Sequence, residues 1–274
     1  MAIRLARFLA RAGVTSRRGA ADLVRTGRVR VNGHPPIGPG DPIDPGADQV
    51  TVDGRILALP GTVWLALHKP PGYVTSRTAT PRYPSVFVLV EDASPGLVAV
   101  GRLDVLSEGL LLFTTDGDAA NRLMHPRWQV DRTYRVEVSG RPPVDAAAIL
   151  AHGVALEDGE PPVRPVAWRF EAGKSGGVLE VTLREGRTRI VRRMAAVLGL
   201  GVRWLKRVAY GPVRLGELAP GRARALTERE LAALYGAIGL PAPEGLSRSG
   251  RGPAAPAASR RPSPRPRSHQ RGGR

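Results

Sequence analysis

The residues best suited to chemistry lie in a short segment between two apolar runs, Val100-Gly101-Arg102-Leu103-Asp104. This position predicts that Asp104 is carried by a loop between two strands, and loops held by a rigid sheet often carry catalytic groups. A carboxylate there could act as a nucleophile or as a general base. The neighbouring Arg102 equally allows a purely structural salt bridge with Asp104, so the segment alone leaves both interpretations open.

A tyrosine in an alternating segment is a second candidate. Between residues 133 and 139 the side chains of Tyr134, Val136 and Val138 share one face of a predicted strand, and the polar residues share the other. A tyrosine on the apolar face of a strand is either a core residue or a residue that lines a site. The pattern does not decide between these two roles for Tyr134.

A basic helix is predicted over residues 187–198. At about 100° per residue, one face of this helix carries the apolar side chains Ile190, Met194, Val197 and Leu198. The opposite face carries Arg189, Arg192 and Arg193. A cluster of guanidinium groups on a helix anchored in the core is suited to binding phosphate groups.

Composition and spacing exclude several other chemistries. The chain has no cysteine, which rules out disulfides and thiolate zinc sites, and its five histidines form no close helical pair, so we expect no metal site. Gly173-Lys174-Ser175 is not a phosphate-binding loop, because Trp168 stands where the loop needs its first glycine. Asp116 and Asp118 lack the further ligands of a calcium loop, and Asp118 is expected to cap the following helix.

The net charge predicts a polyanionic partner. The 274 residues include 41 Lys and Arg against 24 Asp and Glu, which gives a formal charge of +17. An apolar content of 42% is enough for a folded core. Because no apolar run approaches the roughly 20 residues of a membrane span, we expect a cytoplasmic protein with no membrane partner.

The elements that must position these groups divide the chain into three regions. Residues 1–60 predict a small module, with helical spacing over 3–12, a second helix capped by Ser16 that ends near Gly27, and short strands at 29–31 and 50–52. The second helix and its margins carry four arginines that either contact phosphate groups or form a solvated face, namely Arg17, Arg18, Arg25 and Arg28.

Residues 61–240 predict an α+β domain around a largely antiparallel sheet. The predicted strands lie near residues 63–67, 97–100, 110–113, 133–139, 163–170 and 178–183. Helices are predicted at 144–150 and 187–198, and a capping box of Thr227 and Glu230 opens a last helix through Ile238. Residues 241–274 hold eight arginines, seven prolines and one acid, and this composition predicts a disordered basic tail that adds salt-sensitive RNA affinity.

Over residues 1–240 the sequence resembles the RsuA/RluB family of ribosomal RNA pseudouridine synthases. Gly101-Arg102-Leu103-Asp104 with the following Glu108-Gly109-Leu110 is similar to the family's catalytic motif, and His68-Lys69-Pro70 is similar to the segment before it. Glu185-Gly186-Arg187, Val191-Arg192-Arg193 and Leu205-Lys206-Arg207 are similar to a third motif. Residues 1–60, with Arg28-Val29-Arg30-Val31-Asn32-Gly33, resemble the RNA-binding module of a small-subunit ribosomal protein.

The resemblance implies that the chain isomerises a chosen uridine of ribosomal RNA, or of a ribosomal subunit precursor, to pseudouridine without a cofactor or metal. Asp104 matches the essential aspartate, Arg192 the basic residue paired with it, and Tyr134 the active-site tyrosine. Arg102 is expected either to fill the gap left by the flipped-out base or to hold the neighbouring strand. The other expected RNA contacts are Arg187, Arg189, Arg193, Lys206 and Arg207. Thr188 and Ile190 depart from the family's usual asparagine and glutamine.

Two functions therefore follow from the sequence. The first is a site-specific synthase, for which we favour a target uridine in the large ribosomal subunit and expect a monomeric protein. The second is a non-catalytic RNA-binding factor in ribosome assembly, which the charge, the N-terminal module and the altered third motif would also allow.

Overall fold

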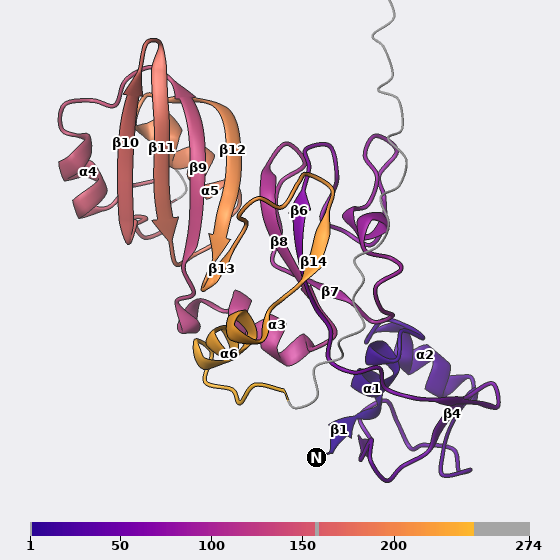
Figure 1. The fold of residues 1–274 in the computed structure, drawn as a ribbon. Helices are drawn as coiled ribbons and strands as arrows, with labels where there is room; N and C mark the ends of the chain where they lie inside the picture. The colour runs from indigo at the N-terminus through magenta and orange to yellow at the C-terminus, as the bar shows by residue number, and fades with distance from the viewer. Residues whose placement is uncertain (1, 157–158, 244–274) are drawn as a thin grey trace, which may run out of the picture.

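The computed structural model describes residues 2–156 and 159–243 (Figure 1). The predicted tail over 241–274 lies, apart from its first three residues, outside the described residues. Three apolar clusters organise the chain, one built from residues 3–59 and two from residues 63–240. No helix within the described ranges is long and apolar enough to cross a membrane.

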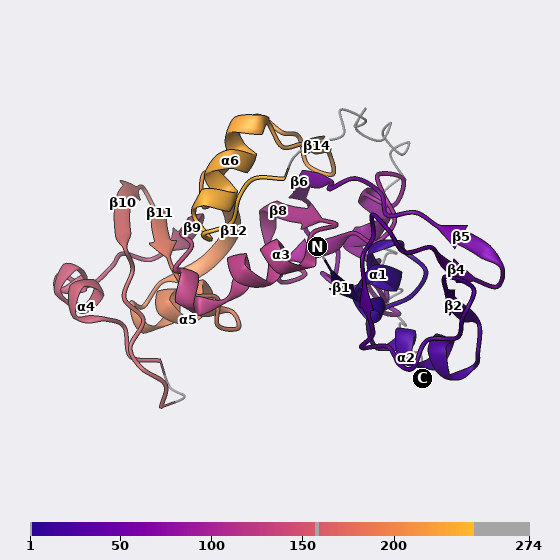
Figure 2. The ribbon, with the colours of Figure 1, turned by 90° about the horizontal axis from the view of Figure 1, so that it is seen from below.

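The N-terminal module contains two short helices and five short strands. Its helices are α1 (Leu5–Arg11) and α2 (Gly19–Arg25), and its strands are β1 (Ile3–Arg4), β2 (Val29–Val31), β3 (Pro42–Ile43), β4 (Val50–Val52) and β5 (Arg55–Leu57). The strands β2, β4 and β5 form one antiparallel sheet, while β1 pairs with β3. Helix α1 buries Leu5, Phe8 and Leu9 in the cluster of the module. Figure 2 shows the module at one end of the molecule.

A nine-stranded sheet forms the larger domain. Its strands are β6 (Trp64–Lys69), β7 (Val98–Val100), β8 (Glu108–Thr114), β9 (Arg132–Ser139), β10 (Ala167–Gly173), β11 (Gly176–Leu183), β12 (Gly201–Tyr210), β13 (Val213–Arg214) and β14 (Ala223–Ala225). The main path runs β10-β11-β9-β12-β8-β6-β14, and every described pairing is antiparallel except that of β12 with β8. The predicted α+β class with a largely antiparallel sheet is therefore confirmed.

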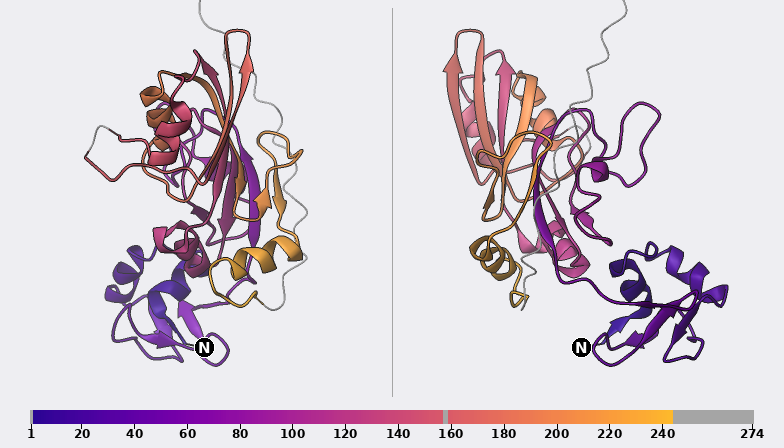
Figure 3. Two further views of the ribbon diagram at one scale, coloured as in Figure 1. Left: turned by 90° about the vertical axis from the view of Figure 1, so that its left-hand side faces the viewer. Right: turned by 45° about the vertical axis from the view of Figure 1, so that its right-hand side comes forward.

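Helices cover the two faces of this sheet (Figure 3). Helices α4 (Ala146–His152) and α5 (Ile190–Val197) pack on one face, and α3 (Gly117–Met124) and α6 (Glu228–Gly236) pack on the other. The alternation of a strand explains both contacts, because Leu65 and Leu67 of β6 belong to the first cluster whereas Trp64 and Ala66 belong to the second. Two short 3₁₀ helices lie at Val86–Leu89 and Pro126–Trp128.

Several sequence predictions need correction. Strand β12 was not predicted at all, although it joins the two halves of the sheet. Helix α5 begins at Ile190 rather than at 187, because Arg189 adopts a left-handed conformation with φ of 52°. Val197 is 45% exposed, and Val191 and Ala195 fill the apolar face in its place. Asp116, not Asp118, caps α3, since its carboxylate accepts hydrogen bonds from the amides of Asp118 and Ala119.

Element boundaries also shift at several positions. Helix α1 is shorter than predicted, α2 starts three residues after Ser16, and Val144 lies outside α4 in full exposure. Strand β10 begins at Ala167, because the preceding Val163 forms only an isolated bridge with Val154. The capping box of Thr227 and Glu230 is confirmed at the start of α6.

The parallel pairing of β8 with β12 depends on a glycine. Gly109 adopts φ of 115°, and a Cβ atom placed on it would lie 2.3 Å from the carbonyl oxygen of Arg207. A side chain at this position would push the two strands apart or strain the backbone. The absence of a side chain at residue 109 therefore lets the two halves of the sheet join.

We predict that Gly109→Ala lowers the free energy of unfolding by about 2–4 kcal/mol, from backbone strain and overpacking together. Chemical denaturation at equilibrium measures the change. Gly236→Ala is the matched control, because a Cβ atom there meets nothing within 4 Å and φ is not positive. A Gly109→Ala protein as stable as the control would show that the two strands do not need this close approach.

Candidate active site

Asp104 lies in the loop of residues 101–107 between β7 and β8, and its side chain is exposed. The residue before it, Leu103, is 7% exposed and packs in the same apolar cluster as β6, β9 and α5. The loop therefore anchors one side chain in the core and presents the next one, a carboxylate, to solvent. Arg102 on the other side of Leu103 is also exposed, and no salt bridge joins it to Asp104 within the described chain.

The loop is held by hydrogen bonds from a buried lysine. The side chain of Lys69, at the end of β6, is 0% exposed. Its Nζ donates to the carbonyl oxygens of Ser107 at 2.8 Å, Asp104 at 3.2 Å and Val105 at 3.3 Å, and also to that of Pro70 at 3.1 Å. Because an ammonium group has three protons, these four acceptors share its donors and fix the course of the loop.

The segment after Lys69 adds three further hydrogen bonds to the loop. The hydroxyl of Thr75 donates to the carbonyl of Leu103 at 2.8 Å and accepts from its amide at 3.2 Å. The amide of Gly72 donates to the carbonyl of Val105 at 2.8 Å. Residues 69–75 thus contact the backbone on both sides of Asp104, and the loop is held in place independently of any ligand.

The environment of Lys69 changes its acidity. Burial lowers the pKa of Lys69 to about 8, although the carboxylates of Asp104 and Glu108 act in the opposite direction. The second buried cation nearby, Arg207, lowers it further. The protein interior next to the loop of Asp104 therefore carries positive charge that is shielded from water.

Glu108 connects three strands directly behind the loop. Its carboxylate receives Nε1–H of Trp204 at 2.8 Å, forms an ion pair with Nζ of Lys206 at 2.9 Å, and lies 2.8 Å from Nε2 of His68. Burial alone would raise the pKa of Glu108, but the hydrogen bonds from Lys206, Trp204 and His68 outweigh it, and the net shift is downward. Since His68 and Lys69 are consecutive on a strand, they hold the start of β8 from opposite faces of the sheet.

Tyr134 lies on the face of the sheet that Lys69 also occupies. The strand register places Tyr134 opposite Arg207, Arg207 opposite Gly109, and Gly109 opposite Lys69. Directly opposed residues point to the same face, so the tyrosine, the buried arginine and the lysine form one row across β9, β12 and β6. Tyr134 is 7% exposed and packs in the cluster that contains Leu103.

Arg192 lies on α5, next to a residue of the same apolar cluster. Its neighbour Val191 packs in the cluster of Leu103 and Tyr134, while Arg192 itself is half-buried. Among the residues that the structure describes, Arg192 and Asp104 form no ion pair, so the expected pairing of these two charges is absent in this conformation. The departure at Ile190 has a structural result, because this side chain is 3% exposed and belongs to the core.

The remaining predicted RNA-binding residues fall into two groups. Arg17, Arg18 and Arg189 are exposed, Arg193 is half-buried, and Arg25 and Arg28 are exposed while pairing with Asp22 and Asp53. Three others have partners inside the fold. Arg187 contacts Glu185 at 2.5 Å and Glu160 at 2.9 Å, which raises its pKa; Lys206 pairs with Glu108; and Arg207 is 2% exposed.

The prediction that Arg207 contacts RNA needs correction, because this side chain is buried. Its Nε donates to the carbonyl of Leu110 at 2.8 Å, its guanidinium lies 5.1 Å from the ring centre of Tyr210, and its Nη2 is buried without a hydrogen-bond partner in the described residues. These contacts hold β12 on β8. The sequence of β12 mixes charged and apolar residues, so it does not reveal that Arg207 holds two strands together.

Lys69 was missed as a functional residue by sequence reasoning, although the motif that contains it was recognised. The available signal was a lysine at the end of the apolar run Trp64–His68, where a solvated cation is not expected. In the described part of the chain, no three His, Cys, Asp or Glu side chains are grouped as metal ligands would be.

We predict that Lys69 titrates near pH 8. The chain contains three lysines, so the Nζ and Cε resonances of labelled lysine can be followed from about pH 6 to about pH 11, and the signal missing in Lys69→Met is assigned to Lys69. Because the folded-state pKa of about 8 lies below the ordinary 10.5, the unfolded chain binds more protons between these values. This group therefore makes stability rise as the pH increases through that window. A Lys69 signal that titrates near 10.5 would contradict a dehydrated ammonium beneath the loop.

Comparison with known proteins agrees with this geometry. The family described as RNA pseudouridylate synthase matches residues 63–197, and the S4 domain matches residues 3–48. An uncharacterized RNA pseudouridine synthase of Aquifex aeolicus (strain VF5) is 39% identical over 242 residues, which cover 88% of this chain and 96% of the relative. Ribosomal large subunit pseudouridine synthase B of Bacillus subtilis (strain 168) is 36% identical, with 83% of this chain and 93% of the relative covered.

A solved structure shares the fold over most of the chain. It is described as a crystal structure of pseudouridylate synthase, is 30% identical, and aligns with a TM-score of 0.60 over 85% of this chain and 99% of that one. The sheet, the loop that presents Asp104, and the N-terminal module are thus parts of a known kind of enzyme. The chain belongs to the RNA pseudouridine synthases of the RsuA/RluB type, which carry an S4 domain before the synthase domain.

Proposed function

We propose that this enzyme isomerises a uridine of ribosomal RNA to pseudouridine and that Asp104 is its catalytic carboxylate. The observation that carries the proposal is the exposed carboxylate of Asp104 on a loop whose backbone is fixed by the buried Lys69. The name of the Bacillus relative supports a uridine of the large ribosomal subunit as the target.

The reaction can be balanced with groups of this chain and water. The bond from N1 of uracil to C1′ of ribose breaks, the base turns within the site, and C5 bonds to C1′. The proton on C5 then leaves to solvent, and N1 gains a proton. Asp104 can attack the sugar, attack the base, or remove a proton from the ribose, and each route needs its ionised form.

Tyr134 and Arg192 are proposed to complete the site. The ring of Tyr134 can stack on uracil, and its hydroxyl is a candidate for removing the proton from C5. Arg192 is proposed to pair with Asp104 when RNA is bound, because catalytic contacts often tighten only in the substrate complex. Such a pair would hold the carboxylate charged and oriented.

RNA binding is proposed for the exposed arginines on both parts of the chain. Arg102, in the loop that carries Asp104, is proposed to fill the gap when a uridine leaves its helix or to hold the neighbouring strand. Arg17 and Arg18, at the start of α2, present two cations to the phosphate backbone. The enzyme is proposed to act as a monomer on ribosomal RNA or on a subunit precursor.

We predict that Asp104→Asn reduces isomerisation by about 10³-fold or more, because the substitution removes the charge but preserves the size of the side chain. The assay is release of tritium to water from ribosomal RNA transcripts labelled at C5 of uridine. Asp92→Asn is the matched control, since it changes the charge equally at an exposed position away from the loop.

Undiminished tritium release by Asp104→Asn would contradict the catalytic assignment. Absence of release by the wild-type enzyme on transcripts of either subunit would contradict the reaction itself. In that case the assembly-factor hypothesis gains support, and it requires that Asp104→Ala rescue ribosome assembly as well as the wild type does.

A further inference from the structure

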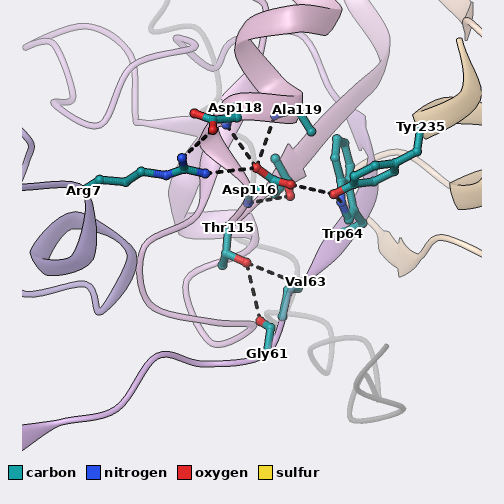
Figure 4. Close-up of polar contacts among 10 residues, drawn as sticks. Arg7, Gly61, Val63, Trp64, Thr115, Asp116, Asp118, Ala119 and Tyr235 are labelled. Atoms are coloured by element: carbon teal, nitrogen blue, oxygen red, sulfur yellow. Dashed lines mark hydrogen bonds and ion pairs between the residues drawn. The ribbon is translucent and has the colours of Figure 1, made fainter. Parts of the chain in front are cut away.

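The N-terminal module touches the synthase domain at both ends of α1. Near the start of the helix, the guanidinium of Arg7 pairs with the carboxylate of Asp118 and lies 3.7 Å from that of Asp116 (Figure 4). The side chains of Arg7 and Asp116 are 23% and 20% exposed, so this pair is partly removed from water. Charge pairs that are shielded in this way are screened less by salt than surface pairs.

The carboxylate of Asp116 has hydrogen-bond partners of its own within the synthase domain. One carboxylate oxygen accepts the amides of Asp118 at 3.0 Å and Ala119 at 3.2 Å, which caps α3. The other oxygen accepts the hydroxyl of Tyr235 at 2.8 Å, and that hydroxyl in turn accepts Nε1–H of Trp64 at 3.1 Å. Burial raises the pKa of Tyr235, which keeps this donor protonated. Arg7 thus binds a carboxylate that α3, α6 and β6 already hold in place.

A backbone contact lies at the other end of α1. Gly13 and Gly96 both adopt positive φ, and they face each other across the two parts of the chain. A Cβ atom on Gly13 would lie 2.3 Å from Cβ of Pro95, and one on Gly96 would lie 2.4 Å from the carbonyl oxygen of Arg11. Each backbone therefore approaches the other as closely as only glycine permits.

Two side-chain atoms of α1 near these contacts are shielded from water. The Nε atoms of Arg7 and Arg11, one turn apart on α1, are both inaccessible to solvent. A charge contact at one end, a backbone contact at the other, and two shielded guanidinium nitrogens on the same helix describe a specific interface. A flexible tether between two independent modules would need none of these features.

We propose that α1 docks the N-terminal module on the synthase domain through the Arg7–Asp116–Asp118 cluster and the Gly13–Gly96 contact, and that this docking selects the uridine. The inference that docking selects the uridine rests on the proposed function. A docked module holds its RNA segment at a fixed distance from Asp104. Only a folded RNA whose two elements have that separation binds both surfaces at once, and a loosely tethered module would accept a range of separations.

The docking is tested by the distance between two spin labels. Because the chain has no cysteine, Ile56→Cys on β5 and Val144→Cys before α4 create a single labelled pair at exposed positions. We expect one narrow distance distribution for the otherwise wild-type protein. Arg7→Glu and Asp118→Arg should each broaden it through repulsion, and the two together should narrow it again because the charges are exchanged.

Arg4→Glu is the matched control. It makes the same change of charge three residues before Arg7, on an exposed side chain for which the described residues provide no hydrogen bond or ion pair. Its distance distribution should remain narrow. Narrow distributions in both Arg7→Glu and Asp118→Arg would overturn the docking.

Selection is tested on RNA with the same variants. Once the uridine that the wild type modifies has been mapped on a full transcript, a fragment of about 30 nucleotides around it serves as the second substrate. For Arg7→Glu we expect kcat/KM to fall about tenfold or more on the full transcript and to stay within about twofold on the fragment, with partial recovery in the exchanged pair.

A broadened distance together with an unchanged rate and site on the full transcript would overturn the selection. A wild-type enzyme that releases no tritium from any transcript would refute the proposed function and the selection with it. The label distances would still decide the docking, because they do not depend on activity.

Discussion

The buried ammonium group of Lys69 is the constraint on which the site depends. A cation removed from water is costly unless it has partners, and here the partners are backbone carbonyls of the loop that carries Asp104. If the loop moved, the charge would lose the oxygens that compensate its burial. The fold itself therefore holds the loop in its orientation, as the catalytic role proposed for Asp104 would require.

Strand β8 connects the loop of Asp104 with the contact to the N-terminal module. All seven of its residues are buried, and its first residue, Glu108, directly follows the loop of Asp104 and is held by His68, Trp204 and Lys206. Two residues beyond its other end, Asp116 caps α3 and meets Arg7 of the N-terminal module. One rigid strand thus links the loop of Asp104 to the surface on which the module docks.

The close contact between β8 and β12 determines where Tyr134 lies in the sheet. Because Gly109 has no side chain, β12 can approach β8 and bring β9 with it, so that Tyr134 falls in one row with Arg207 and Lys69. The sequence predicts that Arg207 contacts RNA, whereas its guanidinium is buried in the structure. Its role is to hold the sheet together beneath the site.

Regular patterns were predictable from the sequence, and elements shaped by long-range contacts were not. The alternation around Tyr134 and the capping box of Thr227 are local, and both were predicted correctly. Strand β12 was missed because its inward positions include Arg207, whose burial depends on a hydrogen bond to Leu110, far away in the chain. The start of α5 depends on the left-handed Arg189, and no periodicity of the helix reveals such a residue.

The site itself was predicted in part. The motif around Asp104 predicts the catalytic carboxylate, and this role stays a prediction. The clamp by Lys69 depends on the pairing of β6 with β8 and could not be read from residue types alone. The contact of Arg7 with Asp116 and Asp118 joins two regions that the sequence treats as separate. Residues whose partners lie a hundred positions away need the fold before their role becomes visible.

The most direct test of the central claim is a map of pseudouridines in ribosomal RNA from cells that lack this gene, complemented with either the wild-type or the Asp104→Asn enzyme. The account predicts that a specific pseudouridine disappears on deletion, returns with the wild-type enzyme, and stays absent with Asp104→Asn. A map that is unchanged by deletion, or that Asp104→Asn restores in full, would contradict the assignment of this carboxylate as the catalytic group.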